Sequence, residues 1–240
     1  MSQLKQVTDT NTTDSRWHWL YKVAGVSALV TTVLIVAHMI VFILWPPPST
    51  AIDYFKLFQG NALLGYLTLD LLYVVDNVLL IPILLALYIA LRKTNESFML
   101  IAVALGFIGI AALFASNPAA NMHFLSGQYA AAATDAQRAL LLAAGEAMLA
   151  VWVGTAYHIS LILGSVALVI IPIVMLQSKI FSKATAYMGI LANVLALGLY
   201  VPKIGIYILL FSVIFLLVWY ILITRRLFQL GRDMPKEELQ

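Results

Sequence analysis

Six apolar segments, each of about the length that crosses a membrane, follow one another along this 240-residue chain. A helix needs about 20 residues to cross the hydrocarbon core of a bilayer, and it satisfies its backbone hydrogen bonds internally. The fifth segment is short for this purpose. Taken together, the segments predict an all-α, multi-pass membrane protein with six transmembrane helices in one bundle. They are 23–45, 66–91, 98–115, 152–177, 184–201 and 204–224.

The composition supports the same class of protein. Hydrophobic residues make up 62% of the chain and charged residues 10%, with a mean hydropathy of +0.96. Soluble domains have roughly 45–50% apolar and about 25% charged residues. The net charge of +3 is small and comes from the segments that flank the spans, which favours contact with lipid over nucleic acid. The chain has no cysteine, so disulfides, thiolate nucleophiles and cysteine metal ligands are excluded.

Basic residues are unevenly distributed between the two sides that six spans would create. Eleven of the 14 Lys and Arg residues fall on the side of the termini, and cytoplasmic loops of membrane proteins carry such an excess. We therefore predict a single membrane domain at 23–224 in a plasma membrane, with cytoplasmic tails at 1–22 and 225–240. The eleven residues are Lys5, Arg16, Lys22, Arg92, Lys93, Lys179, Lys183, Arg225, Arg226, Arg232 and Lys236; the others are Lys56, Arg138 and Lys203.

The extracytoplasmic segment between the third and fourth spans, residues 116–151, has a helix signal of its own. Thr134 and Gln137 form a capping-box pattern, which marks the start of a helix. No proline then interrupts the helical pattern until Pro172, and Gln177 ends it. At 1.5 Å per residue such a helix would be about 60 Å long, roughly twice the thickness of the hydrocarbon core.

This length allows two arrangements. The helix either projects well above the outer surface or bends near Gly145 or Gly154. The preceding stretch, 116–133, contains an Asn-Pro pair and an alanine run. We expect it to lie along the outer surface as a cap on the bundle.

Four ionisable side chains interrupt the predicted spans, and all four fall in the half of each span that faces away from the termini. An ionisable group in lipid is expensive, so such residues usually face the bundle interior or a wet cavity. Tyr73 and Asn77 share a sector of one helix surface with two aspartates, at 100° per residue. The pattern predicts a ligand-binding pocket lined by His38, Asp70, Tyr73, Asp76, Asn77 and His158.

The first functional hypothesis is a binding or transport-like protein whose polar pocket opens to the extracytoplasmic side. Its ligand would be a small molecule or an ion, and the bilayer is the one partner that the sequence requires. In this hypothesis His38 is the natural partner of Asp76, which needs a partner near mid-depth. A purely structural His–Asp pair is the alternative. Oligomeric state, substrate, and the choice between transport, sensing and catalysis stay open.

Two further hypotheses need a bound group that nothing in the sequence demands. A membrane-embedded metal enzyme acting on lipid would use His38, Asp76 and His158 as ligands and Glu146 as acid or base. However, neither a His-x-x-x-His nor a Glu-x-x-His pattern is present. A haem held between the same two histidines is the third hypothesis, because they are expected at similar depth on different helices.

The C-terminal half of the chain resembles a prokaryotic membrane family, the domain of unknown function 4386 proteins. The strings that carry the resemblance are Asp135-Ala136-Gln137-Arg138 through Glu146-Ala147, Met175-Leu176-Gln177-Ser178-Lys179 at the end of the long apolar helix, and Tyr187-Met188-Gly189-Ile190. The resemblance implies a six-helix, multi-pass membrane protein in a prokaryotic plasma membrane. The family has no established activity, so the resemblance assigns no site residue.

Overall fold

The computed structural model describes residues 15–232, and this part of the chain is all-α, with no strand. The helices that cross the long body of the molecule are α1 (His18–Leu44), α4 (Leu71–Leu91), α5 (Glu96–Ser116), α8 (Thr155–Gln177), α9 (Lys183–Ala196) and α10 (Gly205–Leu230). Shorter elements connect them: η1 (Ser15–Trp17), α2 (Ala51–Gly60), α3 (Ala62–Thr68), α6 (Ala119–Ala131), α7 (Asp135–Trp152) and η2 (Leu197–Tyr200).

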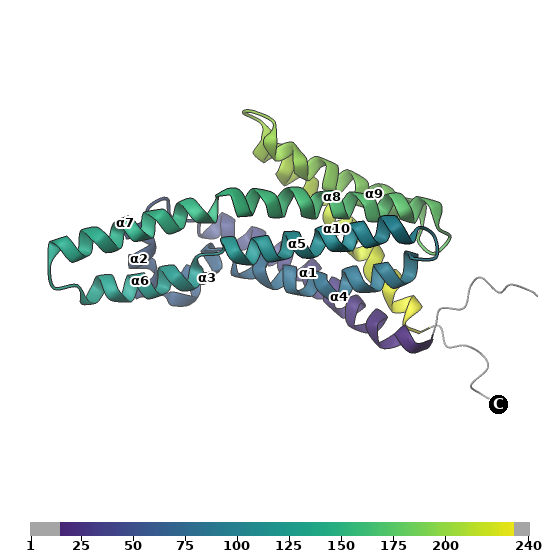
Figure 1. The fold of residues 1–240 in the computed structure, drawn as a ribbon, viewed down its shortest axis with the longest axis horizontal. Coiled ribbons are helices and arrows are strands. Elements are labelled where there is room, and N and C mark those ends of the chain that lie inside the picture. Colours follow the sequence, from purple (N-terminus) through teal and green to yellow (C-terminus); the bar gives the residue numbers. More distant parts are fainter. Residues whose placement is uncertain (1–14, 233–240) are drawn as a thin grey trace, which may run out of the picture.

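The six long helices form a closed ring. In chain order each helix packs against the next, and α10 completes the ring by packing against α1 (Figure 1). Small residues permit close approach between neighbours. A Cβ atom on Gly109 of α5 would lie 3.2 Å from backbone atoms of α8, and one on Gly189 of α9 would lie 2.6 Å from both Pro172 and Trp219. The ring therefore depends on glycines, whose lack of a side chain lets α5 approach α8 and lets α9 approach both α8 and α10.

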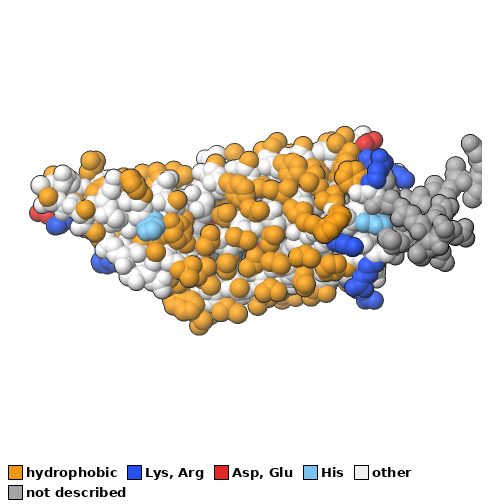
Figure 2. Space-filling view, turned by 90° about the horizontal axis from the view of Figure 1, so that it is seen from below, with side chains coloured by type: hydrophobic (Ala, Val, Ile, Leu, Met, Phe, Trp, Pro, Cys, Tyr) orange, Lys and Arg blue, Asp and Glu red, His pale blue; other side chains and the backbone are white. Residues whose placement is uncertain are grey.

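One half of the ring has a solid apolar core. Its largest members, each at most 1% exposed, include Tyr21, Leu87, Met99 and Trp219. This packed half surrounds the start of α1 and the end of α10, and most of the basic side chains in view gather at the same end of the molecule (Figure 2). The rest of the ring surface in that view is mostly hydrophobic (Figure 2), as expected for helices that face lipid.

Helices α2, α3, α6 and α7 form a second body, the end domain, beyond the other half of the ring (Figure 1). It has its own buried cluster, which includes Tyr54, Phe55, Phe58 and Met122. Helix α6 runs on beyond α5, antiparallel to α7, and does not turn across the end of the ring (Figure 1). The stretch 116–133 therefore forms one arm of a helical hairpin that extends beyond the ring, with α7 as the other arm (Figure 1). Its predicted position as a cap along the outer surface stays a prediction.

The helix boundaries confirm most of the predicted segments and correct some of them. The capping box at Thr134 is present, and the long helix that follows is interrupted at Val153–Gly154, one of the two predicted positions. The second predicted span is shorter than expected, because the helix is interrupted at Leu69–Asp70 before α4 begins.

The tail boundaries at 22 and 225 fall inside helices, since α1 begins at His18 and α10 continues to Leu230. The remaining parts of the predicted tails, 1–14 and 233–240, lie outside the described residues.

Within the described residues, five helical stretches are long and apolar enough to cross a membrane. Two of them combine elements: α5 with α6, and α7 with α8. Helix α9 has 14 residues and is not among the five; with η2 it occupies the place of the fifth predicted span. The chain therefore has the helical architecture of a multi-pass membrane protein.

Candidate functional site

A cavity of about 620 Å³ lies inside the ring, in the half next to the end domain. All six ring helices contribute to its lining. On α1 and α5 the lining residues lie toward the C-terminal end, and on α4 and α8 toward the N-terminal end. The packed half closes the cavity on the side of the basic residues. We call this half of the ring the cavity half.

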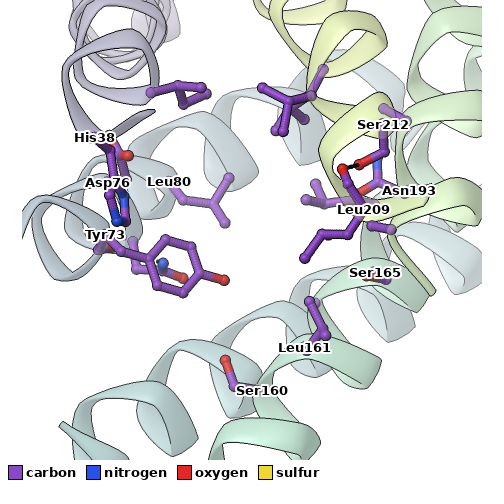
Figure 3. A pocket seen from close by; sticks show the side chains of 18 of the residues that line it. His38, Tyr73, Asp76, Leu80, Ser160, Leu161, Ser165, Asn193, Leu209 and Ser212 are labelled. Atoms are coloured by element: carbon purple, nitrogen blue, oxygen red, sulfur yellow. Dashed lines mark hydrogen bonds between the residues drawn. The ribbon is translucent and has the colours of Figure 1, made fainter. Parts of the chain in front are cut away.

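One wall of the cavity carries the polar residues that the sequence predicted. His38 of α1 and four residues at the start of α4 line it: Asp70, Tyr73, Asp76 and Asn77. His38, Tyr73 and Asp76 lie on one side of the space, facing Ser165, Asn193 and Ser212 on the other (Figure 3). Five of the six predicted binding residues are thus brought together by α1 and α4.

Asp70 lies where this wall meets the end domain, and it connects three parts of the molecule. Its backbone has a left-handed conformation (φ 63°) between α3 and α4, which Asp tolerates better than most residues. Its Oδ1 lies 3.4 Å from His38 Nε2, and its Oδ2 accepts a hydrogen bond from Trp152 Nε1 at 2.7 Å. Asp70 therefore links α1 and α4 to the end of α7.

Three helix interruptions meet at this level. They separate α3 from α4, α5 from α6, and α7 from α8. Asn117, between α5 and α6, donates from Nδ2 to the carbonyl of Leu69 at 2.7 Å. Nearby, the hydroxyl of Tyr54 donates to the carbonyl of Thr68, and burial, reinforced by the charge of Asp70, raises the pKa of Tyr54. The interruptions form the joint between the ring and the end domain.

Asp76 lies deeper in the ring than Asp70 and has different contacts. It is 8% exposed, and its Oδ1 has no hydrogen-bond partner among the described residues. On α1, His38 acts on its carboxyl group through charge, and Thr31 acts on it through its hydroxyl group as a hydrogen-bonding side chain. The ion-pair contact of His38, however, is with Asp70. His38 thus contacts Asp70 directly and acts on its predicted partner, Asp76, through charge alone, while Asp76 Oδ1 has no hydrogen-bond partner among the described residues.

His158 does not join the site. It is exposed, does not line the cavity, and its Nδ1 lies 3.1 Å from the hydroxyl of Tyr200 in η2. The preceding residue, Tyr157, lines the cavity in its place. The two histidines proposed to hold a haem therefore do not face a common space.

The metal hypothesis also finds no assembled ligand set. Between residues 15 and 232 no group of three His, Cys, Asp or Glu side chains is close enough to hold a metal ion. Glu146, assigned as acid or base in that hypothesis, accepts a hydrogen bond at Oε1 from the backbone N–H of Ala51 at 2.8 Å. It thus satisfies a free N–H at the start of α2, a structural role.

The opposite wall is apolar with a few small polar groups. Asn193 Nδ2 donates to the carbonyl of Gly189 at 2.8 Å, and Ser212 Oγ donates to that of Leu209 at 2.6 Å (Figure 3). These donors are used within their own helices. Aliphatic side chains such as Leu80 and Leu161 fill most of the remaining lining (Figure 3). The cavity therefore has one acidic wall and one largely apolar wall.

Sequence reasoning missed three residues at this site: Thr31, Tyr157 and Trp152. Thr31 shares a helix face with His38, so its position was readable from periodicity, although its role was not. Trp152 contacts Asp70 only because two helix breaks bring the ends of α7 and α3 together. No spacing in the sequence signals that contact.

No family model, curated protein or solved structure matches this chain.

Proposed function

We propose that this chain is a six-span membrane protein with both termini in the cytoplasm. In this proposal the ring binds, or carries, a small molecule in a cavity that opens toward the extracytoplasmic side. The observation that carries the proposal is the cavity itself, a partly open space in the ring with a buried carboxyl group on its wall, whose Oδ1 has no hydrogen-bond partner among the described residues. Ligand sites are typically apolar clefts with a few converging polar groups.

The arrangement of the six ring helices supports the six-span topology. Helix α9, although short, packs between α8 and α10, and η2 extends it as far as Tyr200. With α9 counted as a span, the start of α1 and the end of α10 lie on one side. Arg92 and Lys93, in the turn after α4, and Lys179, between α8 and α9, lie on that same side. Because these side chains are positively charged, they favour the cytoplasm as the location of this side of the ring.

The polar wall supports a binding function. Placing an ionisable group inside a membrane-spanning bundle is costly, and such groups commonly mark a pathway or a ligand site. A purely structural role would give both carboxyl groups partners. Asp70 has such partners in Trp152 and His38, whereas Asp76 Oδ1 has none among the described residues. The Asp76 carboxyl group is therefore available to a ligand.

Because the natural chain has no cysteine, single cysteines can test this proposal directly. Ser165→Cys places a thiol in the cavity, and Val33→Cys places one on the apolar outer face of α1, where Val33 is 62% exposed. A membrane-impermeant cationic methanethiosulfonate reagent would be added to whole cells, and again to inverted vesicles. We expect Ser165→Cys to react from the outside only, and Val33→Cys to react from neither side.

Two results would contradict the proposal. If Ser165→Cys reacts only after denaturation, the cavity is closed to water and the binding function fails. If it reacts only in inverted vesicles, the orientation is reversed. Reaction of a cysteine at Lys203, in the turn before α10, serves as the positive control for the outer side.

A further inference from the structure

We propose that the ligand of this cavity is an amphipathic organic cation, an amine with an apolar chain. Its head group would bind at Asp76, and its chain would extend between α1 and α10 toward the surrounding lipid. The inference rests on the proposed binding function and names the chemical class of the ligand. Three independent features of the described residues carry it: the sign of the charge, the position of the free acceptor, and the place where the cavity reaches the surface.

The charge of the lining excludes an anionic head group. No Lys or Arg is among the described lining residues, whereas two aspartates are. An anion in this space would meet two carboxyl groups, and His38, which already contacts Asp70, is the one side chain of opposite sign among the described lining residues. A cationic or N–H-donating group would instead supply a counter-charge to Asp76.

The free acceptor places the head group. Asp70 already accepts a hydrogen bond from Trp152 and lies 3.4 Å from His38. Asp76 Oδ1, in contrast, is buried without a partner in the described part of the chain. Hydrogen bonds to charged groups are among the stronger ones in proteins. Thr31 Oγ1 on the facing helix is buried and interacts with the same carboxyl group, so its oxygen can serve as a second acceptor for an ammonium group.

A bare metal ion fits this position poorly. Hard cations need about six oxygen ligands, and no cluster of three His, Cys, Asp or Glu side chains lies anywhere in residues 15–232. An ammonium group needs only two or three acceptors, and the remainder of the molecule would contact the aliphatic wall. The opposite side of the cavity, with Leu161 and Leu209, has the character that an alkyl chain requires, and Leu80 adds to it from α4 (Figure 3).

The route of entry lies between α1 and α10. Three of the lining residues are strongly exposed: Ile43 of α1 (71%), and Ile206 (50%) and Leu210 (44%) of α10. Side chains that line the cavity and are this accessible mark the place where it opens. The two helices pack closely near their other ends, where Phe228 lies against Gly25. They therefore leave a side opening in the cavity half, and its apolar edges suit passage of a chain from lipid.

The test compares three probes with the same chain: dodecylamine, dodecanol and dodecanoate. The full-length protein would be held in lipid nanodiscs, with empty nanodiscs subtracted, and saturable binding of tritiated dodecylamine measured with the other two as competitors. We expect dodecylamine to bind saturably, dodecanol to compete weakly and dodecanoate not to compete. Asp76→Asn should raise the Kd for dodecylamine about tenfold or more, through loss of the ionic hydrogen bond.

Two further variants make the result specific. Asp53→Asn changes an exposed carboxyl group in α2, outside the cavity, and should leave the Kd unchanged. Leu161→Trp fills part of the cavity and should weaken binding of the amine and the alcohol alike. This second variant leaves every charge in place, so it tests whether the probes bind inside the cavity even if Asp76→Asn fails to fold.

The outcomes separate this inference from the proposed function. If dodecanol competes as well as dodecylamine and Asp76→Asn has no effect, the cavity binds but the cation class is wrong. If no probe binds saturably while Ser165→Cys is still labelled from outside, the inference fails and the water-accessible site remains. If labelling fails as well, both are overturned.

Discussion

The two halves of the six-helix ring are built from the same helices but filled differently. In the packed half, large side chains such as Tyr21 and Trp219 meet at the centre and are at most 1% exposed. In the cavity half, many of the residues at the centre are small: Gly106, Gly109, Gly164, Ser165, Ala192 and Ala196. The ring is therefore solid or hollow according to side-chain volume, since packed interiors leave few spaces larger than a water molecule.

The halves also differ in how they treat polar groups. The packed half buries hydroxyl and indole groups, and Trp219 Nε1 and Thr224 Oγ1 have no partner among the described residues. The cavity half differs in placing two carboxyl groups at its centre. A void and an unsatisfied carboxyl group both lower stability. Their presence in the same half indicates that the cavity half is arranged for something other than stability.

The largest expected effect comes from creating a void in the packed half. Trp219→Ala removes a side chain that is fully buried and packs on Tyr220 and Gly189. We expect it to lower the free energy of unfolding by about 3–5 kcal/mol. Leu161→Ala, in the cavity wall, should cost much less, because part of its surface already faces empty space. Unfolding in mixed micelles measures both, and equal losses would show that the two halves are equally packed.

The next comparison sets the two aspartates against each other. Asp70→Leu leaves the indole N–H of Trp152 unsatisfied at a cost of about 1–3 kcal/mol, and its left-handed backbone adds strain. Asp76→Leu removes an acceptor that has no partner, so it should leave the unliganded protein as stable or raise its stability. Thermal unfolding of both variants without ligand tests whether only the first substitution lowers stability. Destabilisation by Asp76→Leu as large as that by Asp70→Leu would mean that Asp76 is structural.

The smallest effects distinguish two glycines that face each other across α5 and α8. A Cβ on Gly109 would meet backbone atoms of α8 at 3.2 Å, whereas one on Gly164 would meet nothing within 4 Å. Gly109→Ala should therefore destabilise by about 1 kcal/mol or more. Gly164→Ala should stabilise by about 0.8–1 kcal/mol through helix propensity. If both substitutions destabilise alike, the space beside Gly164 is not open.

Much of the ring was predictable from hydropathy alone, because lipid requires long apolar helices whose lengths are fixed by the bilayer. The interruption at Gly154 was also readable, since glycine weakens a helix and the predicted helix was too long. The break at Leu69–Asp70 was not, because neither glycine nor proline marks it. Asp70 adopts a left-handed backbone there, and tertiary contacts such as the hydrogen bond from Trp152 hold it.

Of the site, only the acidic wall was predictable from the sequence. Helical periodicity placed His38, Asp76 and their neighbours on inward faces, and the structure confirms that they share a cavity. The predicted pocket also included His158, which does not line the cavity; its Nδ1 lies 3.1 Å from the hydroxyl of Tyr200 in η2. Contacts of that kind depend on how separate elements pack, and no spacing along one helix reports them.

The most direct test of the account compares the reactivity of one thiol in each half. Leu161→Cys lies on the cavity wall, and Ala86→Cys lies in the packed half, where Ala86 is fully buried. In the folded protein the account predicts alkylation of Leu161→Cys by N-ethylmaleimide about tenfold faster or more, because a buried thiol reacts only through opening events that cost free energy. Equal rates, both slow and both restored only by denaturation, would show that the ring is solid throughout and contradict the account.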